Sequence, residues 1–191
     1  ATMNDIQATS LLWSWDNKVI AYRTDSGKPK MNFLDPKSDR AVFNQLLLNS
    51  FKGKYVSELQ RSRDNNIRLV YVSSDTEPGI YYLYNNTKKK LAPLIKRRPS
   101  LDRKLLSPMR PISFTARDGM TINGYLTSPI IGQSPQPMVV MVHGGPFGPR
   151  DYWGYNAEAQ LLASHGYLVL QVNFRGSGGY GLSFEKAGYK Q

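Results

Sequence analysis

The sequence predicts a mixed fold in two parts, a series of short antiparallel strands followed by a strand–helix–strand unit. Through residues 1–90, short runs of alternating apolar and polar residues are bounded by Asp, Asn, Gly and Pro, which is the pattern of strands and turns. The turns of that half recur at a regular spacing. After residue 112, two uniformly apolar runs flank an amphipathic segment, as in a parallel β-α-β unit.

The first half contains five expected strands, each ended by a turn. They are residues 11–15, 19–23, 31–34, 67–72 and 80–84. Asp16 and Asp64 are 48 positions apart, and Asp25 and Asp75 are 50 apart. A period of about 40–50 residues built from strands is typical of β-propeller blades. We therefore interpret residues 1–90 as the last two blades of an incomplete propeller, because a ring needs about 4–8 blades; a plain antiparallel meander is the alternative.

A basic segment follows the expected blades and supplies much of the net charge of +11. Prolines at positions 93, 99, 108 and 111 prevent it from forming one helix. We interpret residues 91–111 as a solvated basic connector rather than a nucleic-acid-binding patch, because aromatic residues for base stacking are sparse. The basic residues of this part are Lys88, Lys89, Lys90, Lys96, Arg97, Arg98, Arg103, Lys104, Arg110 and Arg117.

The second half is expected to begin with two strands, at residues 112–116 and 120–127. The run at 138–142 is apolar without alternation, as in a strand covered on both faces. A helix is expected from Asn156 to His165, ended by Gly166, and a second buried strand covers residues 167–172. The two apolar strands should therefore lie parallel, with the helix between them.

A glycine-bearing loop follows each of the two buried strands, at residues 143–149 and 173–181. Ligands of open α/β sheets bind at this end of the strands. Gly144 and Gly145 let the backbone approach a ligand closely, and a free backbone amide there can stabilise an oxyanion. Because Pro146 has no N–H, the amide of Gly145 is the first candidate donor and that of Gly144 the second. His143 in the same loop is expected to be structural.

These motifs resemble the opening of the catalytic domain in the prolyl oligopeptidase family of serine peptidases, in its acylaminoacyl-peptidase branch. The resemblance implies a β-propeller followed by an α/β-hydrolase domain, here residues 112–191 in incomplete form. It implies that the Gly145 amide serves the oxyanion hole, and that His143, Arg175 and Gly176 shape the active site. The intact protein is then expected to hydrolyse short or N-acylated peptides through an acyl-enzyme.

The sequence departs from that family's pattern at its chemical centre. No Gly-x-Ser-x-Gly nucleophile motif occurs, and the two histidines, His143 and His165, precede any nucleophile, whereas the order in such hydrolases is Ser, Asp, His. The Ser/Asp/His triad is thus absent, and we expect this chain to be inactive without a complementary remainder of the same enzyme. Alternatives are an esterase of the same fold and a non-catalytic propeller-based interaction module.

Other partners and cofactors are not predicted. Cysteine is absent, which excludes disulfides and thiolate metal ligands, and no metal or other cofactor is implied. Gly176–Gly181 fits the Gly-x-Gly-x-x-Gly spacing of dinucleotide sites but lacks the required first-strand context. No apolar run approaches the ~20 residues of a membrane helix, so no membrane partner is expected. The compartment, cytoplasmic or periplasmic, and the oligomeric state stay open.

Overall fold

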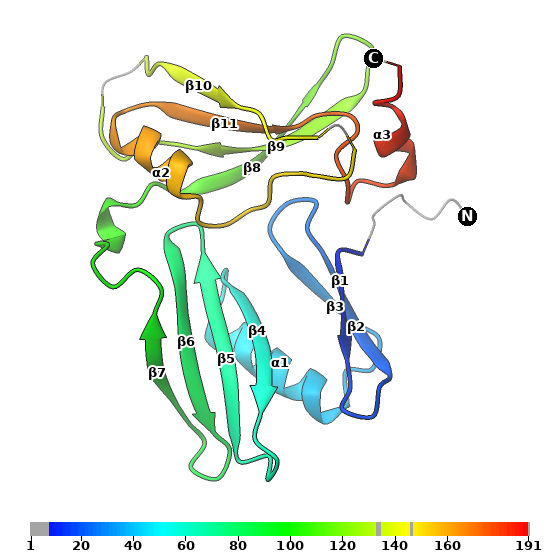
Figure 1. Ribbon diagram of the computed structural model, residues 1–191, viewed down its shortest axis with the longest axis vertical. Coiled ribbons are helices and arrows are strands. Elements are labelled where there is room, and N and C mark those ends of the chain that lie inside the picture. The colour runs from blue at the N-terminus through cyan, green and yellow to red at the C-terminus, as the bar shows by residue number, and fades with distance from the viewer. Residues whose placement is uncertain (1–7, 133–134, 146, 191) are drawn as a thin grey trace.

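The computed structural model describes residues 8–132, 135–145 and 147–190 as three β-sheets with few helices (Figure 1). The first sheet is antiparallel, with its strands in chain order: β1 (Ser10–Trp13), β2 (Val19–Thr24) and β3 (Lys30–Phe33). Asn17 in the β1–β2 turn has a φ of 62°, a left-handed conformation that asparagine tolerates better than most residues. The turn expected at residues 16–18 is confirmed.

The second sheet is an antiparallel meander with one face covered by a helix. Its strands, also in chain order, are β4 (Tyr55–Arg61), β5 (Ile67–Ser74), β6 (Glu77–Asn85) and β7 (Lys90–Lys96). Side chains of β5 are alternately buried and half-buried, as expected for a strand packed on one face. Helix α1 (Asp39–Ser50) covers that face, and the shared core consists of Phe43, Leu47, Val56, Val70, Val72 and Tyr84.

The third sheet contains the expected parallel unit. Strands β8 (Met109–Thr115), β9 (Thr121–Thr127), β10 (Met138–Met141) and β11 (Leu168–Asn173) lie in the order β10-β11-β9-β8. β10 and β11 are parallel, whereas β9 is antiparallel to both β11 and β8. Helix α2 (Ala157–Ser164) connects β10 to β11 and packs on Val169 through Ala159 and Ala163. The chain also forms a short 3₁₀ turn, η1 (Arg103–Leu105), and α3 (Leu182–Lys186).

Both ends of α2 follow from local chemistry. The Asn156 side chain accepts a hydrogen bond from the Ala159 amide at 2.9 Å, which caps the helix N-terminus. Gly166 follows the C-cap residue His165 with a φ of 89°, the left-handed conformation with which helices commonly end. The predicted start and stop of this helix are confirmed.

The structure differs from the sequence-based expectation in the first ninety residues. That stretch was expected to contain strands alone, but residues 39–50 form α1. The long turn expected at residues 74–79 is only Asp75–Thr76, because Glu77, Pro78 and Gly79 belong to β6. Strand β7 also occupies residues 90–96 of the basic segment, so the part without regular strands is shorter than expected.

Strand β10 was expected to be covered on both faces, and this was wrong. Met138, Val140 and Val142 are 55%, 51% and 68% exposed. The reason lies in the strand order: β10 is the edge strand of its sheet within the described residues. α2 packs near Met141, on the other face of the strand.

Two turns of the first two sheets reach the third sheet (Figure 1). At the tip of the β2–β3 hairpin, the carbonyl oxygens of Asp25 and Gly27 accept hydrogen bonds from the Tyr125 hydroxyl on β9, at 3.2 and 2.9 Å. At the β5–β6 turn, the Asp75 carboxylate accepts a hydrogen bond from the Met109 amide at 2.8 Å. These contacts fix the third sheet, and the loops that follow its parallel strands, on the other two sheets.

Candidate functional site

The two glycine-bearing loops lie side by side and are joined through their backbones. The Gly148 amide donates to the Gly176 carbonyl at 3.0 Å, and the Gly178 amide donates to the Gly148 carbonyl at 3.1 Å. This makes a short parallel bridge between Gly148 and Ser177. A Cβ on Gly178 would lie 2.7 Å from the Gly148 carbonyl oxygen, so the close approach of the loops requires glycine at position 178.

His143 is held at the start of the first loop by three contacts. Its Nδ1 atom lies 2.8 Å from the Gly144 carbonyl oxygen, and its Nε2 atom lies 3.0 Å from the Oγ atom of Ser177. Because a carbonyl only accepts hydrogen bonds, Nδ1 carries a hydrogen, and in the neutral ring Nε2 accepts from Ser177. The imidazole also stacks on Phe174 at a centroid distance of 4.4 Å. These contacts fix the ring against the second loop.

The backbone at Gly144 and Gly145 is exposed. A Cβ added at Gly144 would meet nothing within 4 Å, and one added at Gly145 would come no closer than 3.7 Å to a neighbouring atom. Within the residues that the structure describes, neither amide donates a hydrogen bond. Pro146, the next residue, lies outside the described residues. Two neighbouring backbone N–H groups are therefore left without an acceptor among the described residues.

Arg175 and Gly176 are neighbours in the second glycine loop but contact different parts of the structure. Arg175 forms a two-pronged ion pair with Asp118 in the β8–β9 turn, at 2.9 and 3.1 Å. A backbone hydrogen bond from Met120, followed by the contact with Arg175, lowers the pKa of the Asp118 carboxyl. Gly176 lies inside the loop pair, with a φ of 100°, and its amide donates to the Phe184 carbonyl at 3.1 Å. Arg175 thus ties the second loop to the β8–β9 turn.

A polar network beneath the loops was not found from the sequence. The Asn173 side chain, which is fully buried, accepts from the Asp151 amide at 2.7 Å and donates to the Asp151 carbonyl at 3.0 Å. The Gln171 amide group donates to the Asp151 carboxylate at 2.8 Å, and burial raises the pKa of that carboxyl. Arg150 and Tyr180 complete the network. Gln171 and Asn173 interrupt an otherwise apolar strand, which is a signal that sequence reasoning could have used.

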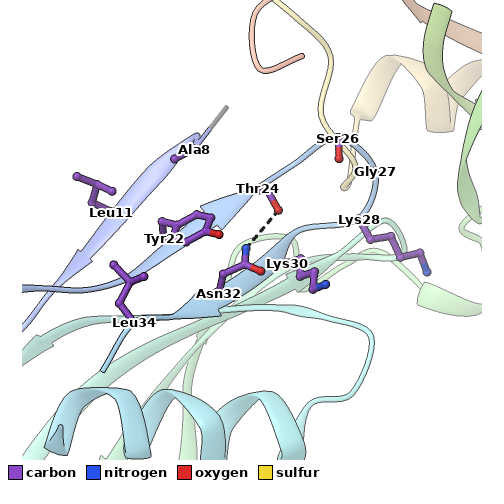
Figure 2. Close-up of a pocket in the computed structure, with 10 residues that line it drawn as sticks. All are labelled: Ala8, Leu11, Tyr22, Thr24, Ser26, Gly27, Lys28, Lys30, Asn32 and Leu34. Atoms are coloured by element: carbon purple, nitrogen blue, oxygen red, sulfur yellow. Dashed lines mark hydrogen bonds between the residues drawn. The ribbon is translucent and has the colours of Figure 1, made fainter. Parts of the chain in front are cut away.

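A hollow lined by other residues lies on the first sheet. It has a volume of about 920 Å³, and no residue of the two glycine loops is among the residues that line it (Figure 2). Tyr22, Thr24 and Asn32 point toward it, and Asn32 donates to Thr24 at 3.5 Å. The described residues contain no group of three His, Cys, Asp or Glu side chains that would fit a metal ion. They also contain no helix long and apolar enough to cross a membrane.

Comparisons with known proteins agree on one family. Residues 153–191 match the model of the prolyl oligopeptidase family. The chain is 40% identical over 141 residues to dipeptidyl aminopeptidase BIII of Pseudoxanthomonas mexicana, covering 70% of this chain and 20% of that protein. The structure of dipeptidyl peptidase 4 of Porphyromonas gingivalis matches 100% of this chain and 28% of its own, with a TM-score of 0.65 and 18% identity.

The comparisons do not select a branch of that family. An acylaminoacyl peptidase structure from Pyrococcus horikoshii also matches, with a TM-score of 0.55 and 25% identity over 86% of this chain and 25% of its own. Dipeptidyl peptidases and acylaminoacyl peptidases therefore both appear, and the narrower assignment to the acylaminoacyl-peptidase branch is not supported. The chain spans about a fifth of the length of the curated relative and about a quarter of the two solved structures.

Proposed function

We propose, from its similarity to the prolyl oligopeptidase family, that this chain supplies the oxyanion-binding side of a serine peptidase active site. The observation that carries the proposal is the exposed amide of Gly145, which has no hydrogen-bond partner among the described residues, on a loop that His143 fixes to its neighbour. The Gly145 amide would donate to the negative oxygen of the tetrahedral intermediate, with the Gly144 amide as second candidate. Such donors act on charge that develops only during the reaction.

The remaining groups would come from outside these residues. In the intact protein a serine hydroxyl attacks the substrate carbonyl, a histidine takes its proton and passes it to the leaving amine, and an aspartate orients the histidine. The peptide C–N bond breaks to give an acyl-enzyme, which water then hydrolyses. The expected substrates are short or N-acylated peptides, and the chain alone is expected to be inactive.

The sheet order supports this placement. Strand β10 precedes the candidate loop and has exposed apolar side chains and a free edge within the described residues. A further parallel strand beside β10 would end next to Gly145, because the carboxyl ends of parallel strands meet at one edge of a sheet. We place the nucleophile on that strand, with residues 112–191 as the opening of an α/β-hydrolase domain.

The first two sheets are proposed to be the last blades of a propeller, residues 1–90, with residues 91–111 as the connector. Support comes from the recurrence of turns and from the two antiparallel sheets that the chain forms there. The first sheet has three strands and the second has four. Helix α1 then separates the two blades, and β7 extends the second blade into the connector.

A pair of substitutions at position 145 tests the proposal in the full-length protein that carries this chain. Gly145→Ala keeps the amide, and its Cβ would come no closer than 3.7 Å to a neighbouring atom, so kcat should stay near that of the wild type. Gly145→Pro removes the N–H, and kcat should fall by about 10²–10³, as for loss of an oxyanion donor. Circular dichroism checks that both variants fold. Equal activity of the two variants would remove the role assigned to this amide.

Two assays on the same full-length protein test the two alternative functions, an esterase and a non-catalytic interaction module. An esterase of this fold would cleave acyl esters but not the matching peptides, so the two substrate types are assayed in parallel. A non-catalytic interaction module would not react with a covalent serine-hydrolase probe. Labelling of the full-length protein, together with peptide cleavage, is the result expected here.

A further inference from the structure

Arg150 connects three segments that lie far apart in the sequence. It directly follows the first glycine loop, and its side chain is buried, with the residue 8% exposed. The Nη2 atom donates to the Asp25 carbonyl at 2.8 Å and to the Tyr180 hydroxyl at 2.7 Å, while Nη1 is 3.3 Å from the Gly178 carbonyl. One guanidinium thus contacts the β2–β3 hairpin of the first sheet and the second glycine loop.

No carboxylate forms an ion pair with Arg150 among the described residues. Its acceptors are backbone carbonyls and phenolic hydroxyls, and its guanidinium lies over the rings of Tyr152 and Tyr180 at 4.8 and 4.2 Å. Burying a charge without a counter-ion is costly unless its donors are satisfied. The positions of these acceptors therefore fix the orientation of the guanidinium. Only a planar group with several donors at fixed angles can reach all of them together.

The surroundings of Arg150 leave little freedom for the two loops. A Cβ on Gly179 would collide with Nη1 of Arg150, and Gly179 has a φ of 81°. The Tyr125 hydroxyl also donates to the Asp25 carbonyl that Arg150 contacts. A displacement of the hairpin tip would therefore pull on Arg150 directly, and Arg150 lies only five positions after Gly145 in the sequence.

We propose that Arg150 is a positioning residue that makes the geometry of the Gly145 loop depend on the placement of the β2–β3 hairpin. The catalytic consequence rests on the function proposed above; the structural coupling does not. When the hairpin tip is seated, Arg150 holds the described residues 143–145 and 147–149 against the second glycine loop. When the hairpin tip moves away, the Asp25 carbonyl is lost as an acceptor and the loop loses this restraint.

The first test uses Arg150→Lys, which keeps the charge but not the planar fork, in the full-length protein. Arg117→Lys is the matched control, because Arg117 is exposed and makes no hydrogen bond or ion pair with the described residues of either loop. The coupling predicts faster amide hydrogen exchange in residues 143–149 and in residues 25–29 of Arg150→Lys, with the control unchanged. It also predicts a kcat lower by about tenfold to a hundredfold, as for a misplaced catalytic group, with KM within about twofold.

A second variant keeps the test decisive if Arg150→Lys unfolds. Tyr125→Phe removes the hydroxyl that donates to the Asp25 and Gly27 carbonyls of the hairpin and accepts from Arg150 at 3.4 Å. Exchange in residues 143–149 should therefore still rise. Unchanged exchange there in both variants would overturn the coupling. If exchange rises but the wild type neither cleaves peptides nor reacts with the serine-hydrolase probe, the coupling holds and the proposed peptidase function fails.

Discussion

The Nε2 atom of His143 lies 3.0 Å from the Oγ atom of Ser177, and this contact joins the two glycine loops where they leave their strands. Ser177 is fully buried, so its hydroxyl has no access to solvent as an alternative partner. With Nδ1 of the ring directed at the Gly144 carbonyl, the imidazole connects the second loop to the backbone that precedes Gly145.

Removing the Ser177 hydroxyl should loosen this connection. In the full-length protein, Ser177→Ala is expected to lower stability by about 1 kcal/mol, because the His143 ring loses a buried hydrogen-bond partner. Hydrogen exchange in residues 143–145 should rise at the same time. The exposed Ser113→Ala is the control; a Ser177→Ala protein that matches it in both thermal unfolding and exchange would show that the contact does not hold the loop.

Glu58 should make stability depend on pH. Its side chain is fully buried and lies 3.2 Å from Arg40 and from Arg68. Burial raises the pKa of Glu58, and the two arginines oppose the shift without cancelling it. A carboxyl whose pKa is raised on folding stabilises the folded state at pH values below its ordinary pKa, and this contribution is lost as the pH rises through the higher folded value.

The measurement compares the wild type with Glu58→Gln across the acid range. The free energy of unfolding of the wild type should fall relative to that of the variant as the pH rises above about 4.5. Glu158→Gln, an exposed change in the first turn of α2, serves as control. A constant difference between wild type and Glu58→Gln at all pH values would contradict this prediction.

Gly124 should resist replacement although it lies within a strand. It pairs with Val172 across β9 and β11, and a Cβ there would collide with the Gln171 carbonyl oxygen. Gly124→Ala is expected to cost about 1–3 kcal/mol, as for overpacking of a core. In Gly27→Ala, by contrast, the nearest atom would be at 3.7 Å. Chemical denaturation of both variants tests the difference, and equal stabilities would be evidence against a close strand approach at Gly124.

The Gln160 side chain should contribute strongly to the stability of the contact between α2 and the segment before β8. Its side chain accepts from the Ser107 amide at 2.8 Å and donates to the carbonyls of Ser107 and Asp75, at 2.8 and 3.2 Å. Gln160→Met keeps the volume but leaves these buried backbone groups unpaired, at a cost of about 1–3 kcal/mol for each group that water cannot reach. Gln60→Met, on the exposed side of β4, is the control, and thermal unfolding is the measurement.

Turn chemistry made most strands predictable, whereas α1 was missed for a physical reason. Its buried positions include Ala41 and the polar Asn44, while Val42 and Leu46 are exposed. The apolar side chains therefore do not lie along one face, and the helical hydrophobic pattern is weak. The exposure of β10 also could not be read from its composition, because an apolar run does not reveal whether a strand is central or at an edge.

In the candidate site, too, the sequence reveals some of the residues and not others. The glycine loops could be located from the sequence because Gly144, Gly145 and Gly176 follow two recognisable strands. The roles of Arg150 and Asn173 could not, because their partners are mainly backbone groups of distant turns, such as the Asp25 carbonyl. No residue type marks a carbonyl that will be used as an acceptor, so only the folded chain identifies these contacts.

The hairpin contact made by Arg150 is to a main-chain oxygen, and this has an evolutionary consequence. Any amino acid at that position offers the same oxygen, so point substitutions at the tip can accumulate without affecting the acceptor. A one-residue insertion or deletion in the hairpin, however, would shift the oxygen out of reach. Among related sequences, the length of this hairpin should therefore vary less than its composition wherever the arginine is retained.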